Sequence, residues 1–368
     1  MSRACPDCLT RARLLEALAP RIDRVATRAG RPVSVLLGRS DDELLEATAI
    51  ATADREAVLR AARTAGRADA ERPVDGGAVC IHDEAYPERL RDLPDPPRAL
   101  FHTGPLDRLT ALVRERPVAI VGSRRPSAQA AENAFQLGRR LAAAGLTVVS
   151  GLAFGVDAAC HHGALAAAGT PIAVLASGAD RASPVGNRAL YDDVRAAGVV
   201  ISEMPWSAAP WRWLFPARNR IMAALGEMTV VVEAAERSGS LITATFAAEL
   251  GRTVGAMPGP AGARLTEGSN LLIRDGCVPV RGATDVLDAL FDVGTAEDVH
   301  ADARRRRIEG DAVLCQLLDS IEVGETFEQM GRRSGLPARE LRAALARLER
   351  TGLIRRSGLR GFVATTTG

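Results

Sequence analysis

Two short arginine-containing motifs have the composition expected of a phosphate-binding surface. Gly122-Ser123-Arg124 follows a β-branched run and opens a helical segment, so it offers backbone N–H groups, a hydroxyl and a guanidinium at a helix start. A second motif, at positions 218–220, reads Arg-Asn-Arg. Such groups donate hydrogen bonds to phosphate oxygens. The two motifs therefore predict binding to a nucleic-acid backbone.

The stretch 206–220 interleaves aromatic and basic side chains, among them Trp211, Arg212, Trp213 and Phe215. Aromatic faces and arginine planes stack on unpaired bases and tolerate many sequences. This mixture predicts a preference for single strands. As an alternative, Trp211 and Trp213 can simply pack the edge of the domain.

Two further loops extend this predicted rim of hydrogen-bond donors. Each follows a strand-like run and opens a helix, where backbone N–H groups attract anions. The predicted nucleic-acid-binding residues are Gly122, Ser123, Arg124, Ser150, Gly151, Arg212, Phe215, Arg218, Asn219, Arg220, Ser238, Gly239 and Ser240. The loop that begins with Gly122-Ser123-Arg124 lacks the Gly-x-Gly-x-x-Gly fingerprint of dinucleotide sites, so no cofactor is expected.

Asp157 and His161 are spaced like a candidate catalytic pair. They lie four residues apart, which places both on one face of a helix. The structural alternative is that Asp157 is favoured by the dipole of the first helical turn, and that His161 bonds to it.

The six cysteines are scattered along the chain and do not form a disulfide framework. Cys5 and Cys8 make a Cys-x-x-Cys pair. No second pair or nearby histidine is evident to complete a zinc site, and no strand precedes the pair as in thioredoxin-like motifs. We therefore interpret these cysteines as incidental and reduced, and expect no metal.

The overall charge limits how nucleic acid can be bound. The net charge is only +2, and all the Lys+Arg residues are arginines. Any such binding must therefore be local. The hydrophobic fraction of 47% fits a globular protein. Because neither an apolar run of membrane-spanning length nor a secretory signal is visible, a cytoplasmic location without membrane contact is expected.

Between residues 116 and 290, short β-branched runs alternate with helical ones, which is typical of parallel βα units. The expected strands are Val118–Val121, Thr147–Ser150, Ile172–Leu175, Val199–Ser202, Met228–Val232 and Val254–Met257. Each is continuously apolar, as in strands covered on both faces. The predicted fold class is α/β, with an extended Rossmann-like parallel sheet.

Further segments flank this core. The predicted divisions are a small helical domain at 1–75, a proline-interrupted connecting segment at 76–112, the Rossmann-like domain at 113–292, a linker at 293–308 and a winged helix at 309–368. The winged helix is expected as helices at 311–320, 326–334 and 337–350, with a two-stranded wing at 353–364 carrying Arg355, Arg356 and Arg360. Whether it binds DNA or protein is left open.

Taken in order, these motifs closely resemble the DNA-processing protein A family of natural transformation. The motifs that carry the resemblance are Tyr86-Pro87, Gly122-Ser123-Arg124, Ser150-Gly151-Leu152-Ala153, Asp157 with His161, Ser202-Glu203, Phe215 to Arg220, Ser238 to Ala244, Pro258-Gly259 and Gly268-Ser269-Asn270. They span roughly 86–280. Two departures are the missing Tyr-Gly at 128–131 and Ser183-Pro184 in place of Tyr-Pro.

The resemblance implies single-stranded DNA binding and protection, delivery of the RecA recombinase onto that DNA, and a homodimer through the Rossmann-like domain. It also implies a sterile-alpha-motif-like helical domain before the core. By position, Ser123 and Arg124 would contact phosphate, Arg212 would occupy a basic pocket position, Phe215 would stack on a base, and 218–220 would complete the rim.

The main alternative is an enzyme, since nucleoside-monophosphate N-glycosidases share this kind of core. Those enzymes need a Pro-Gly-Gly-x-Gly-Thr turn followed by a catalytic glutamate. Here Ser238-Gly239-Ser240 replaces the turn, and no carboxylate follows Thr243 until Glu249. No turnover is therefore expected. A small-nucleotide sensor is a third interpretation, because one phosphate pocket can serve either ligand.

Overall fold

The structure is a computed structural model that describes residues 4–29, 33–71, 75–291, 308, 311–323, 325–357 and 361–364. Its contacts divide the chain into two compact units. The larger unit comprises Met1–Ala142 and Leu146–Asp292. The smaller comprises Ala143–Gly145 and Val293–Gly368.

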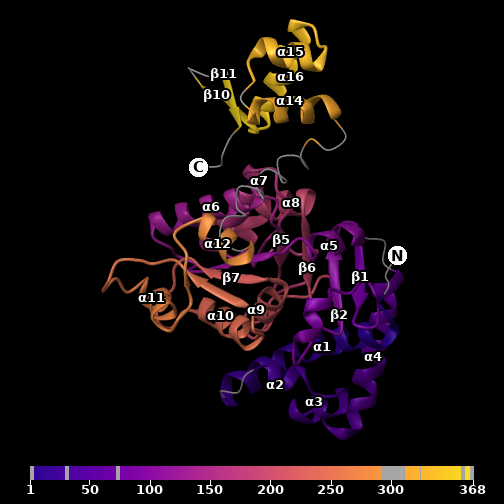
Figure 1. The fold of residues 1–368 in the computed structure, drawn as a ribbon. Coiled ribbons are helices and arrows are strands. Elements are labelled where there is room, and N and C mark those ends of the chain that lie inside the picture. Colours follow the sequence, from indigo (N-terminus) through magenta and orange to yellow (C-terminus); the bar gives the residue numbers. More distant parts are fainter. Residues whose placement is uncertain are drawn as a thin grey trace. The chain divides into compact units, whose positions relative to one another are not determined.

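One sheet forms the centre of the larger unit (Figure 1). Its described strands are β1 (Gly76–Cys80), β2 (Ala99–Thr103), β3 (Val118–Val121), β4 (Val148–Ser150), β5 (Ile172–Val174), β6 (Val199–Ser202), β7 (Met228–Val231), β8 (Thr253–Ala256) and β9 (Val278–Pro279). They are ordered β1-β2-β6-β5-β4-β3-β7-β8-β9. Neighbours from β6 to β9 pair in parallel, whereas β2 is antiparallel to both β1 and β6. The predicted α/β class is confirmed.

Helices cover both faces of this sheet. They are α5 (Leu106–Leu112), α6 (Ala128–Ala143), α7 (Val156–Ala166), α8 (Arg188–Ala197), α9 (Leu214–Leu225), α10 (Gly239–Glu249), α11 (Glu267–Arg274) and α12 (Ala283–Phe291), with the 3-10 turn η2 (Val185–Asn187). α7 and α8 lie on one face, and α9 and α10 on the other (Figure 1). All four residues of β3 are consequently buried, which explains its unbroken apolar sequence. None of the described helices is long and apolar enough to span a membrane.

The segment 76–112, predicted to connect two domains, contributes elements to the sheet and its covering helices. Strands β1 and β2 and helix α5 belong to it, and the two strands form one edge of the sheet. Pro87, Pro94, Pro96 and Pro97 lie between β1 and β2, around the 3-10 helix η1 (Glu88–Asp92), so they break helices without removing a strand hydrogen bond. Tyr86 fixes this segment by donating its hydroxyl to the carbonyl of Pro97 at 2.8 Å.

The N-terminal part is helical, as predicted. It contains α1 (Pro6–Ala29), α2 (Ser34–Leu37), α3 (Asp41–Ala47) and α4 (Thr52–Glu71). A capping box opens α3, with Ser40 and Glu43 satisfying each other's backbone N–H groups. Trp213 packs against this helical core and donates its Nε1 to the carbonyl of Ala19 at 3.2 Å, so its packing role is confirmed. The sterile-alpha-motif likeness stays a prediction.

The smaller unit contains α14 (Ala312–Glu322), α15 (Phe327–Ser334) and α16 (Ala338–Arg350), followed by the antiparallel pair β10 (Ile354–Ser357) and β11 (Gly361–Ala364). This is the predicted order of helices and strands, and its assignment as a winged helix stays a prediction. The structure does not describe the predicted linker up to residue 307. It also does not describe Arg360 or the side chains of Arg355 and Arg356.

The expectation that no further ligand lies near Cys5 and Cys8 was wrong. Strand β1 brings Cys80 and, just beyond it, His82 beside them. The four potential ligand atoms all lie within 4.8 Å of one another. Sequence distance concealed this cluster, because its two halves meet only when α1 packs against the edge of the sheet.

Candidate nucleic-acid interface

A pocket of about 330 Å³ lies where the order of the parallel strands reverses, between β3 and β7. Ligands of open parallel sheets bind at this position, beyond the carboxyl ends of the strands. The pocket is lined by Val121, Gly122, Arg124, Ala153, Asp157, Phe215, Pro216, Arg218, Asn219, Met222, Ser238, Gly239, Ser240, Ile242 and Thr243. The loops after β3, β4 and β7 therefore converge with α9 on one site.

This pocket brings together most of the residues predicted to bind nucleic acid. Those in its lining are Gly122, Arg124, Phe215, Arg218, Asn219, Ser238, Gly239 and Ser240. Those outside its lining are Ser123, Ser150, Gly151, Arg212 and Arg220. The predicted residues in the lining therefore form one site. The predicted residues outside the lining have other positions and roles.

The loop between β3 and α6 is held by Glu233, which sequence reasoning missed. The Ser123 N–H donates to the Glu233 carbonyl at 2.8 Å, and the Ser127 hydroxyl donates to its carboxylate at 2.7 Å. Ser127 also caps α6 by accepting from the Ala130 N–H. The Ser123 hydroxyl accepts from the Arg125 N–H at 3.1 Å. In the structure Ser123 therefore shapes the loop, and the adjacent Arg124 is exposed.

Gly151 leaves room for the side chain of Arg218. A Cβ atom at position 151 would overlap the Arg218 guanidinium. The predicted direct contact of Gly151 with nucleic acid is therefore replaced by a packing role. Ser150 is also an internal residue, because it is fully buried and donates its hydroxyl to the carbonyl of Ile120 at 2.7 Å.

Arg218 is a buried cation at the pocket with incomplete hydrogen bonding. Its Nη1 donates to the carbonyl of Val174 at 2.9 Å, and its Nη2 lies 3.9 Å from the Asp157 carboxylate. Among the described residues, its Nε has no hydrogen-bond partner. Burial lowers the pKa of Arg218, and the neighbouring Asp157 only partly opposes this effect. An anion in the pocket would supply both an acceptor and a compensating charge.

Phe215 and Arg124 form the outer wall of the same pocket. The Arg124 guanidinium carbon lies 4.7 Å from the centre of the Phe215 ring, in a cation–π arrangement. Phe215 is only partly buried. This pair offers a flat aromatic and guanidinium surface on which a base can stack.

The N-terminus of α10 completes the pocket. Ser238 caps this helix by accepting from the Ser240 N–H. Asn219 joins α9 to the same turn, donating its Nδ2 to the carbonyl of Gly239 at 3.2 Å. The first N–H groups of a helix attract anions, so this turn adds to the positive potential of Arg124 and Arg218.

The predicted nucleic-acid contact of Arg220 was wrong. Its side chain is 1% exposed and every guanidinium nitrogen is engaged inside the protein. It donates to Asp95 Oδ2 at 2.9 Å, to Glu203 at 2.7 and 3.0 Å, and to the carbonyls of Asp95 and Ala217. Although burial alone disfavours its charge, Glu203 and Asp95 raise the pKa of Arg220. Burial raises the pKa of Asp95 to about 6 even beside this cation.

Arg212 lies at a neighbouring pocket. It is exposed, and it lines a cavity of about 470 Å³ between the N-terminal helices and α9, together with Asp23 and Phe246. The basic position expected from the resemblance is therefore present but belongs to this second pocket. Of the two aromatic side chains just before Arg212, Trp206 is buried edge-on against Phe101, whereas Trp211 is only partly buried.

The predicted alternative that His161 bonds to Asp157 was not correct. The Asp157 carboxylate instead accepts from the backbone N–H groups of Gly151 and Ala153, at 3.2 and 3.4 Å. His161 is fully buried, and burial lowers its pKa to about 3. Its imidazole is therefore neutral near pH 7, and Asp157 serves to shape the loop after β4.

The fold and site define a parallel α/β protein with a pocket lined by Arg124 and Arg218 at its topological switch point. Residues 77–291 match the family described as DNA recombination-mediator protein A, and the chain belongs to this family. It is 41% identical to the DNA processing protein DprA of Streptococcus pneumoniae over 207 residues, which are 56% of this chain and 72% of that protein. Across the curated relatives, the aligned region covers 52 to 73% of the relative's length.

Two solved structures are similar. The X-ray structure of DNA processing protein A from S. pneumoniae has a TM-score of 0.60 and 32% identity, covering 76% of this chain and 95% of that chain. A structure of the Helicobacter pylori protein, described as revealing its single-stranded DNA binding mode, has a TM-score of 0.52 and 26% identity, covering 58% and 95%.

We predict that Arg220→Met destabilises the larger unit by about 3–5 kcal/mol, because two buried carboxylates lose their counter-ion. Urea unfolding followed by tryptophan fluorescence measures this, since Trp206 and Trp213 are buried in that unit. Arg212→Met is the matched control, because Arg212 is exposed. A loss below about 1 kcal/mol in Arg220→Met would contradict the assigned role of the network.

We predict that the burial of His161 makes the stability of the protein depend on pH. Its pKa is lowered from 6.5 to about 3 on folding, so the unfolded chain binds this proton first. The stabilisation is present above pH 6.5 and declines as the pH falls toward 3. The expected slope is about 1.4 kcal/mol per pH unit from this group. Urea titrations at pH 6 and 5 should show a shallower slope in His161→Leu, and equal slopes would refute the prediction.

Proposed function

We propose that this protein binds single-stranded DNA at the switch-point pocket, with a phosphate beside Arg218 and a base against Phe215. The observation that carries this proposal is the buried Arg218 guanidinium, whose Nε is unpaired among the described residues in a pocket that also holds Arg124 and a helix N-terminus. Family membership and the single-stranded DNA binding described for the H. pylori protein support the same ligand class.

The size and walls of the pocket favour an unpaired strand. A volume of about 330 Å³ is near the lower end for small-ligand sites, so it suits one nucleotide unit. Stacking on Phe215 requires a base whose face is free, which a duplex does not offer. Phosphate contacts should make the affinity fall steeply as salt rises.

We also propose that the site performs no bond-breaking chemistry. Asp157 is the only carboxylate in the lining formed by the described residues, and it is engaged by two backbone N–H groups near Arg218. Burial raises its pKa, and the neighbouring His161 ring is buried and neutral. These features support a loop-shaping carboxylate rather than a general base directed at a nucleotide.

Two finer parts of the proposal rest on the family. The bound strand would be protected and passed to the RecA recombinase, in keeping with the family's description as a recombination mediator. The protein would act as a homodimer through the Rossmann-like domain.

We predict that Arg124→Gln weakens binding to oligothymidylate by about 10- to 100-fold, because a charged hydrogen bond contributes about 1.5–3 kcal/mol. The same variant should lower the salt slope by about one. Phe215→Leu should lose about 5- to 100-fold through reduced stacking. Fluorescence anisotropy measures both. The matched control is Arg125→Gln, since Arg125 is exposed but outside the pocket lining.

Unchanged affinity in both Arg124→Gln and Phe215→Leu would contradict the proposed site. Tighter binding to duplex than to single strands would contradict the proposal that the ligand is single-stranded DNA. Release of free base from a nucleoside monophosphate would favour the enzyme interpretation instead.

The recombinase proposal predicts that immobilised protein retains RecA after nuclease treatment, which removes association bridged by DNA. Arg124→Gln should retain RecA equally after nuclease treatment, because the proposed RecA contact does not require a bound strand. Sedimentation equilibrium should give about twice the chain mass of 38.8 kDa. Loss of RecA on nuclease treatment would contradict the proposed RecA contact. A monomeric mass would contradict the proposed homodimer.

A further inference from the structure

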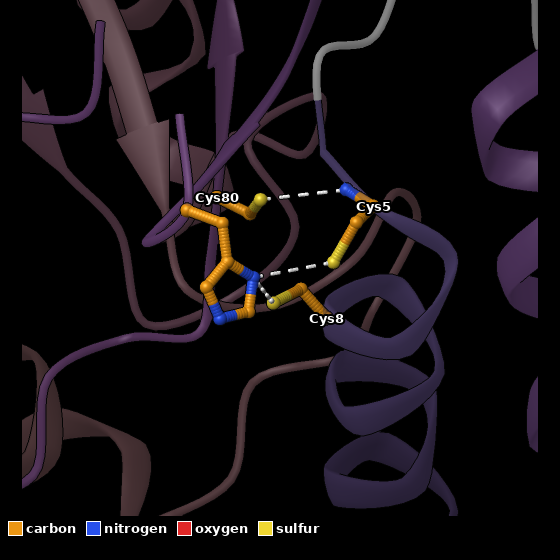
Figure 2. A group of neighbouring side chains, drawn as sticks. Cys5, Cys8 and Cys80 are labelled. Atoms are coloured by element: carbon orange, nitrogen blue, oxygen red, sulfur yellow. Dashed lines mark hydrogen bonds between the residues drawn. The ribbon is translucent and has the colours of Figure 1, made fainter. Parts of the chain in front are cut away.

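Three cysteines and a histidine gather where the N-terminal helix meets the edge of the sheet. Cys5 directly precedes α1, Cys8 lies in the first turn of that helix, and Cys80 is the last residue of β1 (Figure 2). His82 follows two residues later. No part of the proposed DNA-binding pocket uses these side chains, so they require a separate explanation.

The spacing of their ligand atoms matches one small metal ion. The Sγ atoms of Cys5 and Cys8 lie 3.4 and 3.6 Å from His82 Nδ1, and all four ligand atoms are within 4.8 Å of one another. Tetrahedral zinc with bonds of about 2.3 Å to sulfur and 2.0 Å to nitrogen would separate its ligands by about 3.5–3.8 Å. Only small side-chain adjustments would be needed to enclose the ion.

The backbone positions these ligands by contacts of its own. The Ala4 N–H donates to the carbonyl of Ala78 at 3.0 Å, and the Cys5 N–H donates to Cys80 Sγ at 3.4 Å. N–H groups directed at a ligating sulfur stabilise its thiolate form and orient it. Cys8 and Cys80 are also buried in an apolar cluster with Phe101 and Trp206, which limits access of water.

We propose that this cluster is a structural zinc site, with Zn²⁺ held by the thiolates of Cys5, Cys8 and Cys80 and by Nδ1 of His82. Three cysteines and one histidine are a common closed zinc ligand set, and they leave no coordination position for a substrate. The borderline-soft thiolate and imidazole set selects zinc over magnesium or calcium. The reduced state of the described cysteines is compatible with this role.

The site would act as a cross-link between distant parts of the chain. It joins the start of α1 to the end of β1 and thereby encloses helices α1 to α4 in one closed loop. Because a metal bound only by the folded chain stabilises that fold, zinc would hold the N-terminal helices on the edge of the sheet.

The first test is the metal content of the full-length protein purified without chelators, measured by plasma mass spectrometry. We expect close to one zinc per chain in the wild type and in Cys277→Ser, the matched control, whose free cysteine lies outside the cluster. His82→Ala should lower the zinc content at least tenfold. His82→Cys should retain it, because a fourth thiolate also suits tetrahedral zinc.

The His82 variants keep the test independent of folding defects, because His82 is exposed and its removal leaves the buried packing of Cys8 and Cys80 intact. Cobalt titration of the metal-depleted protein provides a second readout. We expect the intense visible bands of tetrahedral cobalt with thiolate charge transfer in the wild type, and their loss in His82→Ala.

Chelation should lower the melting temperature of the wild type by several degrees and leave His82→Ala unchanged. The proposal is overturned by wild-type protein that contains no zinc and gives no tetrahedral cobalt spectrum. It is also overturned by zinc content that persists in His82→Ala, by iron as the native metal, or by a Cys5–Cys8 disulfide in the freshly purified protein.

Discussion

The buried guanidinium of Arg220 joins three parts of the larger unit that are distant in sequence. It links α9 to Glu203 at the end of β6 and to Asp95 in the segment between β1 and β2. Removing these charges from water is costly unless every donor finds an acceptor, and here the protein supplies acceptors to all three nitrogens. The position of α9, and with it the placement of Phe215 and Arg218, depends on this network.

With α9 fixed, the switch point of the sheet becomes a pocket that holds the Arg124 and Arg218 guanidinium groups. Gly151 admits the Arg218 side chain, Asp157 lies near it without fully satisfying it, and the capped start of α10 approaches from the other side. Among the described residues, the Arg218 Nε has no hydrogen-bond acceptor, and burial disfavours the charge of its guanidinium. A phosphate in the pocket would supply an acceptor for this donor and a compensating negative charge. The packing of the core is thereby connected with the proposed binding of DNA.

Sequence reasoning succeeded where local pattern determines structure. The six runs predicted as strands became the parallel strands β3 to β8. Sequence reasoning failed where tertiary contacts determine which way a side chain points and which residues meet. Residues 218 and 220 were treated as one surface, although positions two apart on a helix point about 200° apart, so one faces the pocket and the other the core. Cys80 and His82 were not connected with Cys5 and Cys8, because only sheet pairing and helix packing bring them together.

The central claim is that an unpaired strand lies on Phe215 at the switch point, and photochemical cross-linking tests it most directly. Irradiation of the protein bound to an oligonucleotide containing 5-iodouracil, followed by peptide mass spectrometry, identifies the aromatic side chain against the base. The account predicts a cross-link within the peptide that contains Phe215. Cross-links confined to residues 309–368, with none in α9, would contradict it.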